Sequence, residues 1–256
     1  MNELPLAEEL KSFARSAVSA VEGALIIARI IRADTDVDWC RGELRRLAGE
    51  AGAGATPAEL VGYLRAQGFA GADSYYEVDN SSLECVLKTR CGIPITLAMV
   101  VIGTGESIGM TATGINFPSH FMVSLDGRLF DPFIMQPIDG AGRRAWLVGT
   151  SAAEKDAFKS ATPVDVVQRM LNNLRALAQS RGDHEAALEL TDYQLIVAPE
   201  SLSIHVDRAE LWAALGATEM ARREIETAIA LAPDAAVRAW FEKLLRRLDA
   251  SGPTLH

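Results

Sequence analysis

The sequence predicts an α+β fold: a helical N-terminal region, a buried helix packed against a small antiparallel sheet, and then an all-α repeat region. Three observations lead to this expectation. Apolar residues recur at helical spacing through the first third of the chain. A long apolar segment is followed by short apolar runs, two of them joined by Asp126-Gly127, a strong hairpin signal. The last third lacks strand signals and carries a period of 34 residues.

The composition is typical of a soluble globular protein, with 49% hydrophobic and 23% charged residues. The net charge of −9, from 34 acids and 25 bases, argues against binding to nucleic acid or to an anionic membrane surface. The densest basic clusters lie at residues 41–46 and at Arg246-Arg247. Acids lie within or beside both clusters, so each is predicted to be a solvated helix face.

The three cysteines, Cys40, Cys85 and Cys91, are too few for a disulfide framework and indicate the reducing cytoplasm. The first residues carry acids where a secretory signal would carry bases, so no export signal is expected. Two uncharged runs, residues 91–105 and 107–125, are too short or too polar for a membrane helix, which needs roughly 20 predominantly apolar residues. We therefore expect a cytoplasmic protein.

The first third is expected to be helical. Residues 4–32 have the apolar spacing of one or two amphipathic helices. Asp34-Thr35-Asp36 supplies N-cap side chains for the next helix. Thr56 is a good N-cap and Pro57 a good first residue for a helix to about residue 67. Residues 68–80 are rich in glycine and aspartate, which predicts an irregular connection.

A buried helix is expected at the centre of the domain. Ser81 or Ser82 is suited to cap a short helix over residues 83–89. Pro94 then suits the first turn of a helix that runs from about residue 95 to residue 107 and is apolar on nearly every face. The strands expected to pack against this helix are residues 111–116, 121–125 and 128–130, with the hairpin turn between the last two.

A polar, alanine-rich segment at residues 150–162 is predicted to separate two domains, over residues 1–155 and 160–250. In the second domain Ala198-Pro199 recurs as Ala232-Pro233, at the tetratricopeptide length of 34 residues. About two repeats and a capping helix over residues 235–248 are expected. Such repeats present a concave face that suits a protein partner.

The two repeats are not equally regular. Gly182 matches Gly216 in the 34-residue register. The second copy has apolar residues where packed helices need them, whereas the first copy has Arg175, Thr191 and Gln194 at the equivalent positions. Because two repeats and a capping helix make a short solenoid, the repeat region is expected to lean on the first domain for stability.

His120 and Asp131 form the strongest candidate for a chemical site. They are 11 residues apart across the predicted hairpin, so their side chains can meet. A carboxylate that binds one imidazole nitrogen orients the ring and leaves the other nitrogen for a nucleophile. The alternative is a structural histidine bonded to a carboxylate, which has the same spacing.

The nucleophile is harder to find. The first turn of the buried helix would lower the pKa of a thiol, but Pro94 stands there. Cys91, three residues earlier, and Thr96, two residues later, are the remaining candidates, whereas Cys85 and Cys40 are predicted to be packing residues. No cofactor or metal is expected, because metal-ligand pairs and a phosphate loop with its lysine are missing from the sequence.

Three polar residues before the buried helix are candidates to line the same cleft: Asn80, Glu84 and Arg90. In the alternative interpretation, Asn80 makes turn hydrogen bonds and Arg90 pairs with a nearby acid.

Several motifs in the sequence together resemble those of a known family. The resemblance rests on Tyr76 and on the run from Asn80 to Ala98, which contains Arg90-x-Gly92-Ile93-Pro94-Ile95-Thr96. It also rests on two later motifs, Phe117-Pro118-x-His120-Phe121 and Asp131-Pro132-Phe133. They closely resemble bacterial transglutaminase-like proteins with C-terminal tetratricopeptide repeats, some of which are named Sir-type invasion regulators. The resemblance covers essentially the whole chain and implies a transglutaminase or papain-like core.

The resemblance also implies roles for individual residues. In the wider superfamily, a cysteine at the start of the central helix works with a histidine and an aspartate, and those two fall on His120 and Asp131. Pro94 falls on the cysteine, so thiol catalysis through that position is excluded. A non-catalytic protein- or peptide-binding regulator is the favoured expectation, and the alternative is a cysteine-type acyl transferase or amide hydrolase that uses Cys91 or Thr96. A purely structural role in an assembly is the third possibility.

Overall fold

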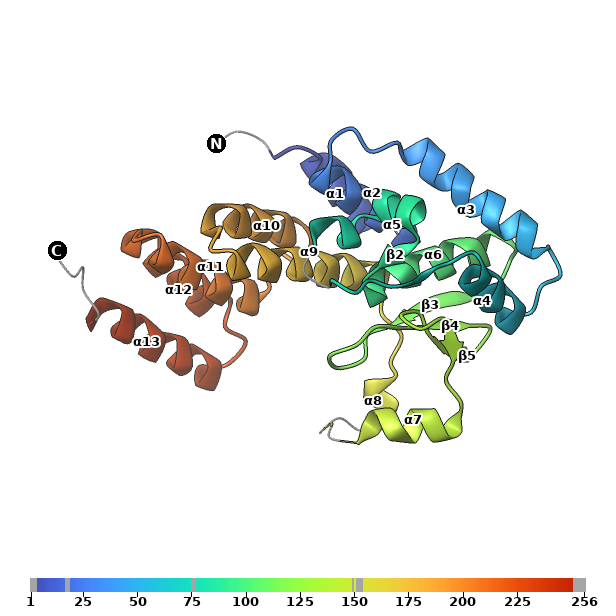
Figure 1. Cartoon of the computed structure of the whole chain (residues 1–256). Coiled ribbons are helices and arrows are strands. Elements are labelled where there is room, and N and C mark those ends of the chain that lie inside the picture. Colours follow the sequence, from blue (N-terminus) through green and yellow to red (C-terminus); the bar gives the residue numbers. More distant parts are fainter. Residues whose placement is uncertain (1–3, 17–18, 75–76, 149, 151–153, 251–256) are drawn as a thin grey trace. The chain divides into compact units, whose positions relative to one another are not determined.

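A computed structural model describes residues 4–16, 19–74, 77–148, 150 and 154–250 of the chain. Tyr76, one carrier of the family resemblance, lies outside the described residues. The chain forms two compact units. We call Glu8–Met170 the core unit, and Leu171–His256 together with Met1–Ala7 the repeat unit (Figure 1). The domain limits given from the sequence, residues 1–155 and 160–250, stay a prediction.

The N-terminal helices of the core unit begin where the sequence places capping residues. Asp36 accepts a hydrogen bond from the Trp39 amide, and Thr56 forms a capping box with Glu59. The helical first third is thereby confirmed. Its helices are α1 (Ala7–Arg15), α2 (Ala20–Ile31), α3 (Val37–Ala51) and α4 (Pro57–Ala66).

A short parallel strand pair precedes the central helix. Helix α5 (Leu83–Thr89) ends because Arg90 takes a left-handed conformation, with φ 65°. The chain then enters β2 (Cys91–Gly92), which pairs with β1 (Ala70–Gly71). β1 and the 3₁₀ helix η1 (Val78–Ser81) lie at the two ends of the stretch predicted to be irregular.

Helix α6 (Pro94–Ser107) is the buried axis of the core unit, as predicted. Every residue from Pro94 to Gly105 is buried. Two of its glycines allow close approach: a Cβ on Gly103 would lie 2.8 Å from Leu44, and one on Gly105 would lie 3.0 Å from Leu125. Helix α3 therefore packs on one side of α6 and the sheet on another.

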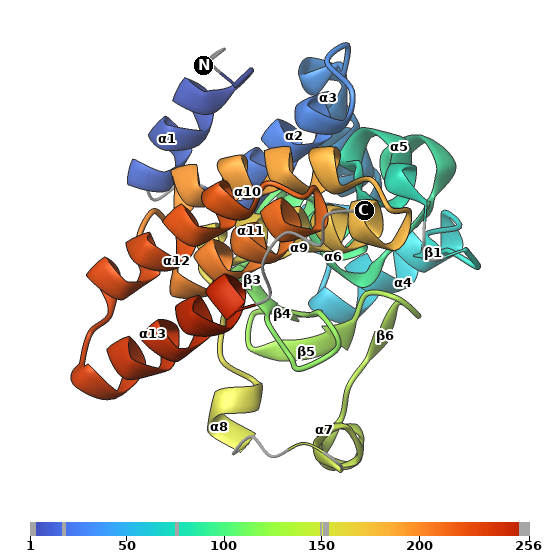
Figure 2. The same cartoon turned by 90° about the vertical axis from the view of Figure 1, so that its left-hand side faces the viewer.

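The sheet has four antiparallel strands in the order β3-β4-β5-β6 (Figure 2). Asp126 and Gly127 both have positive φ, 47° and 79°, which is the conformation of a type I′ hairpin turn. The predicted hairpin is therefore confirmed, whereas the last strand was missed. The strands are β3 (Ala112–Ile115), β4 (Met122–Leu125), β5 (Arg128–Asp131) and β6 (Gln136–Pro137).

Two helices lie on the side of the sheet away from α6, as Figures 1 and 2 both show: α7 (Gly140–Leu147) and α8 (Glu154–Ala157). A second apolar cluster joins them to the sheet. It contains Ile115, Phe117, Met122, Leu129 and Ala157, with Trp146 and Phe158 packed against it.

In the repeat unit, the backbone conformation recurs with the same 34-residue period as the sequence. Gly182 and Gly216 both have φ 75°. The Asp183 amide donates to the Ala178 carbonyl at 3.0 Å, and the same bond recurs 34 residues on, from Ala217 to Trp212, at 2.9 Å. The helices are α9 (Pro163–Ser180), whose first half belongs to the core unit, α10 (His184–Val197), α11 (Leu202–Ala214), α12 (Thr218–Leu231) and α13 (Ala235–Ala250).

The polar residues of the first repeat are buried and form specific contacts. Arg175 pairs with Asp207 at 2.8 Å, and Thr191 accepts a hydrogen bond from Arg208 at 2.7 Å. Gln194 is also buried. The irregular first copy is thus held partly by buried polar contacts, where the second copy has Ala209, Ile225 and Ala228.

Candidate functional site

The structure brings His120 and Asp131 together. His120 lies two residues before β4, and Asp131 ends β5. The hairpin register, with Val123 opposite Phe130, continues to place Asp131 opposite Met122, and His120 lies two residues before Met122. His120 Nε2 lies 3.0 Å from Asp131 Oδ1, and the two side chains are 12% and 7% exposed. The same carboxylate oxygen accepts the Phe133 amide at 2.8 Å, which fixes the carboxylate at the end of the strand.

The other imidazole nitrogen, Nδ1, is available. Within the described residues the only hydrogen bond of the His120 ring is the one from Nε2 to Asp131. A ring held through Nε2 presents Nδ1 to a nucleophile or to a bound ligand. The arrangement can supply a base whose ring is oriented by a carboxylate.

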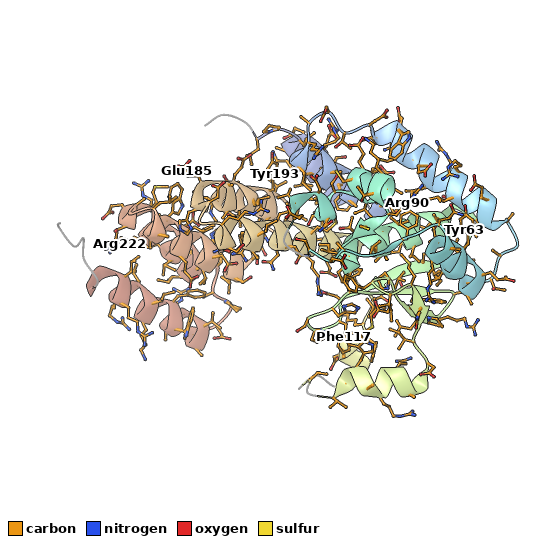
Figure 3. The ribbon with its side chains drawn as sticks, in the orientation of Figure 1. Tyr63, Arg90, Phe117, Glu185, Tyr193 and Arg222 are labelled. Carbon is orange, nitrogen blue, oxygen red and sulfur yellow. The ribbon has the colours of Figure 1, made fainter. Side chains whose placement is uncertain are left out.

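An aromatic wall covers one face of His120. The Trp146 ring of α7 stacks on the imidazole, with centroids 4.6 Å apart and an interplanar angle of 14°. Phe117 meets Trp146 edge-on at 5.6 Å and lies 5.1 Å from Phe158. Figure 3 labels Phe117 on the side of the sheet that faces α7 and α8. Sequence reasoning missed Trp146; the available signal was the Asp139 cap of a short helix that carries a tryptophan.

Pro94 is the first residue of α6, and it supplies neither a side-chain nucleophile nor an amide proton. Ile93 stands at the N-cap without a capping side chain, and its own amide reaches the Asn80 carbonyl at 3.4 Å. Thr96, in the same first turn, is fully buried. Its hydroxyl has no hydrogen-bond partner in the described part of the chain.

The thiols lie in three different environments. Cys91 is exposed on β2, and its amide contacts the Thr89 hydroxyl at 3.3 Å. In the described residues, neither Cys91 nor Thr96 is hydrogen-bonded to His120. Cys85 is partly buried on α5, and Cys40 is fully buried on α3. Burial raises the pKa of the Cys40 thiol to about 12, with help from the Glu84 carboxylate.

Strand β1 lies between β2, which leads into α6, and Phe133, which follows β5. The Gly71 amide donates to the Phe133 carbonyl at 2.8 Å, while Gly71 pairs with Gly92 on its other side. With ordinary strand spacing, Phe133 and Gly92 are then about 10 Å apart. Gly71 is required here, because a Cβ would lie 2.3 Å from the Phe133 ring.

Asn80, Glu84 and Arg90 all have partners within the protein. The Asn80 amide group donates to the Ser74 carbonyl at 2.6 Å. Arg90, labelled in Figure 3, donates to Glu43 at 2.7 Å and lies over the Phe69 ring at 4.6 Å. Under the alternative interpretation, Asn80 makes turn hydrogen bonds and Arg90 pairs with a nearby acid, and these contacts are of that kind.

Glu84 is buried and accepts hydrogen bonds from Lys88 at 2.8 Å and from the Asp36 amide at 3.2 Å. Burial alone would raise the pKa of this carboxyl, but Lys88 and the Asp36 amide together lower it. Glu84 thus joins α5 to the start of α3 as a charged group.

In the part of the chain that the structure describes, no three metal-ligating side chains gather in a group that could hold an ion. Within the same residues, no helix has the length and apolar character needed to cross a membrane.

Comparison with known proteins agrees with this architecture. Residues 39–172 match the model of the transglutaminase-like superfamily, and residues 174–246 match a tetratricopeptide-repeat model. No solved structure matches the chain.

Relatives occur in bacteria and in animals. A UPF0162 protein of Vibrio cholerae is 28% identical over 203 residues, which are 72% of this chain and 75% of that protein. A UPF0162 protein of Pseudomonas aeruginosa is 28% identical over 189 residues, 68% of this chain and 67% of the relative. Human F-box only protein 21 is 26% identical over 157 residues, 56% of this chain but 25% of that protein. These relatives do not carry the Sir-type name, so that name rests on the sequence resemblance alone.

Proposed function

Because the chain belongs to the transglutaminase-like superfamily, whose model covers more than half of it, we propose that it is a non-catalytic member that binds a protein or peptide partner. Its core unit holds the altered site, and its repeats supply a second docking surface. A regulatory role in the cytoplasm, which the Sir-type resemblance implies, is part of this proposal.

The observation that carries the proposal is Pro94 at the first position of α6. By the family resemblance this is the position of the nucleophilic cysteine. Proline removes the thiol that would form the acyl intermediate. It also removes the backbone N–H at that position, a kind of donor that serves in oxyanion holes. Two contributions to acyl transfer are lost at one residue.

The two substitute nucleophiles support the same proposal. The Thr96 hydroxyl is fully buried and has no base within hydrogen-bond distance in the described residues, so nothing activates it. Cys91 is exposed, and among the described residues its sulfur has no hydrogen bond to His120. An unactivated thiol is mostly protonated at neutral pH.

The retained pair has a use without catalysis. His120 Nδ1 offers one hydrogen-bonding group beside the Trp146 ring. A few polar groups set among aromatic side chains are the usual composition of a small binding site. The match of residues 174–246 to tetratricopeptide repeats adds a scaffold of the kind that commonly docks proteins.

A turnover assay tests the proposal. The purified full chain and His120→Ala are incubated with a panel of glutamine-containing peptides, with and without a primary amine, and products are measured by mass spectrometry. We expect neither amine incorporation nor amide hydrolysis above the His120→Ala background. Turnover that requires His120 would contradict the proposal.

The preserved His120–Asp131 hydrogen bond favours one alternative. A cysteine-type acyl transferase or amide hydrolase would use Cys91 as nucleophile, His120 as base and Asp131 as orienter. This alternative requires Cys91 to come within hydrogen-bond distance of Nδ1, and it predicts an activated thiol at residue 91.

A further inference from the structure

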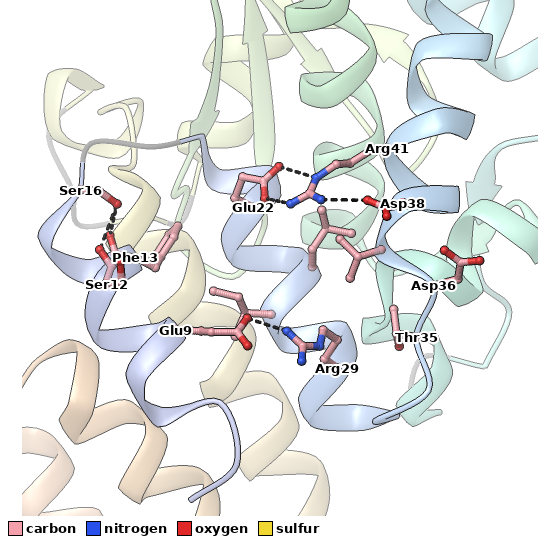
Figure 4. Close-up of a pocket in the computed structure, with 13 residues that line it drawn as sticks. Glu9, Ser12, Phe13, Ser16, Glu22, Arg29, Thr35, Asp36, Asp38 and Arg41 are labelled. Carbon is pink, nitrogen blue, oxygen red and sulfur yellow. Dashed lines mark hydrogen bonds and ion pairs between the residues drawn. The ribbon is translucent and has the colours of Figure 1, made fainter.

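The groove formed by α1, α2 and the start of α3 has a volume of about 610 Å³, but its guanidiniums are paired within the chain (Figure 4). Arg29 pairs with Glu9 at 2.5 Å, and Arg41 pairs with Glu22 at 2.6 Å. By contrast, the Nδ1 atom of His120 has no hydrogen-bond partner among the described residues, and it is not sealed from solvent. A ligand at His120 therefore gains a hydrogen bond without breaking an ion pair.

Trp146 fills the space beside the imidazole. Its indole ring lies nearly parallel to the His120 ring, with centroids 4.6 Å apart, and the Phe117 ring meets the indole edge-on at 5.6 Å. Only 12% of the His120 side chain is exposed. The indole thus lies in a slot that has the imidazole face on one side and the Phe117 ring at its edge. A slot of this shape fits a planar aromatic ring, because aromatic rings prefer stacked and edge-on contacts.

Helix α7, which carries Trp146, is lightly attached to the core. No side chain of α7 is buried, and Trp146 and Leu147 are only partly buried against the apolar cluster that contains Phe117. The helix has eight residues, with Gly140 and Gly142 in its first turn. Helices shorter than about 12–15 residues are marginal without packing. A ligand that takes the place of the indole therefore competes with contacts on which the order of α7 depends.

The chain is tied to the sheet on both sides of α7. Before the helix, the Ile138 amide donates to the Leu129 carbonyl of β5 at 2.8 Å. After it, the Ala161 amide donates to the Gly114 carbonyl of β3, also at 2.8 Å. Neither bond involves α7 itself, so Trp146 can leave the imidazole while both attachments hold.

We propose that α7 is a lid on the His120 site and that Trp146 holds the place of the ligand, a peptide that presents an aromatic side chain. The inference rests on the proposed function and adds to it a class of ligand and a closed state. When the peptide binds, its aromatic ring replaces the indole against the imidazole, and one of its N–H groups donates to Nδ1. Because a carboxylate can only accept, Nε2 donates to Asp131, and Nδ1 of the neutral ring is an acceptor.

The first measurement is a titration of the isotope-labelled full chain with N-acetyltryptophanamide, followed by NMR. The indole N–H signal of Trp146 is identified by its absence from Trp146→Phe. We expect this signal to move toward the position of a solvent-exposed indole, while the signals of Trp39 and Trp240 stay in place. The control probe is N-acetylleucinamide, which is apolar but not planar, and it should leave the Trp146 signal unchanged at the same concentration.

Two substitutions on α7, outside the slot, test whether Trp146 must leave for the probe to bind. Ala145 is exposed, so Ala145→Gly weakens the helix without removing a contact of the indole. At Gly140 a Cβ would lie 3.7 Å from the Arg144 guanidinium, an ordinary contact, so Gly140→Ala strengthens the helix.

A lid predicts opposite effects on the Kd of N-acetyltryptophanamide. Ala145→Gly should lower it about two- to fivefold and Gly140→Ala should raise it about twofold, because the apparent affinity follows the open fraction. The matched control is Ala66→Gly, the same change at an exposed position of α4, which should leave the Kd unaltered.

If Trp146 were instead a fixed wall of the site, Ala145→Gly would weaken binding or leave it as it is, and either result overturns the proposal. A wild-type chain that binds no N-acetyltryptophanamide, or that binds it with the Trp146 signal unmoved, overturns it as well. These readouts are independent of turnover. A failed lid leaves the result of the peptide turnover assay standing, whereas His120-dependent turnover contradicts the proposed function whatever α7 does.

Discussion

Arg90 shows how single residues hold the start of α6. It takes the left-handed conformation that ends α5, accepts the Ala70 amide on its carbonyl at 3.0 Å, and sends its guanidinium to Glu43 at 2.7 Å. Glu43 also receives Arg46, at 2.7 Å, and only 10% of its side chain is exposed. One carboxylate therefore ties α3 to the turn that leads into β2 and Pro94.

Glu43 gives a pH-dependent prediction. Hydrogen bonds from Arg46 and then Arg90 outweigh burial and lower the pKa of Glu43 from 4.5 to about 2. A carboxyl whose pKa is lower in the folded state stabilises the fold above its unfolded pKa and loses that contribution as pH falls. Glu43→Gln should reduce the free energy of unfolding by roughly 2–3 kcal/mol at neutral pH.

The difference between wild type and Glu43→Gln should shrink as pH falls from about 4.5 to about 2, because the wild-type carboxylate becomes protonated in that window. Urea unfolding at several pH values measures it. Glu8→Gln, which alters an exposed pair with Lys11, is the control and should have a much smaller effect. A pH-independent difference would disprove this role for Glu43.

At this scale, spacing could predict that His120 and Asp131 lie close together, because the two-residue hairpin turn fixes the register of β4 and β5, and His120 lies just before β4 while Asp131 ends β5. It could not predict Trp146 against His120 or Phe133 against Gly71. Those contacts join segments whose distance depends on the tertiary packing rather than on local periodicity.

Among the secondary-structure elements, the turns between repeat helices carry the clearest regularity. Gly182 and Gly216 share φ 75° and open space where a Cβ would be. A left-handed conformation costs an L-residue roughly 1–2 kcal/mol. Alanine at either position should therefore meet the same backbone penalty and no steric clash.

We predict that Gly182→Ala and Gly216→Ala each lower the free energy of unfolding of the repeat unit by about 1 kcal/mol. Thermal and urea unfolding followed by circular dichroism provide the comparison. Gly62→Ala, in helix α4 with open space at its Cβ, should be neutral or slightly stabilising. Clearly unequal losses at the two turns would show that they are not equivalent.

Long elements were predictable from the sequence and two-residue strands were not. The capping box at Thr56, the apolar run of α6 and the Asp126-Gly127 turn are local signals that match the structure. Strands β1, β2 and β6 are two residues each. A segment that short has no periodicity, and its conformation is set by the neighbouring backbone that it pairs with.

For the molecule as a whole, family membership and chemistry point in different directions. The superfamily match and the repeat match together account for most of the chain. By the family resemblance, Pro94 falls on the position of the nucleophile, and His120 and Asp131, which are hydrogen-bonded to each other, fall on those of the histidine and aspartate. A His–Asp pair without a thiol at the start of the helix is what we propose for a binding site derived from an enzyme.

The most direct test is iodoacetamide labelling of Cys40, Cys85 and Cys91, resolved by mass spectrometry, at pH about 6 and about 8.5 in wild type and His120→Ala. We predict that Cys91 labels slowly at the lower pH and faster at the higher, equally in both proteins, and that Cys40, buried with its pKa raised to about 12, labels slowest. Rapid labelling of Cys91 at pH about 6 that disappears in His120→Ala would reveal an activated thiolate and contradict the non-catalytic assignment.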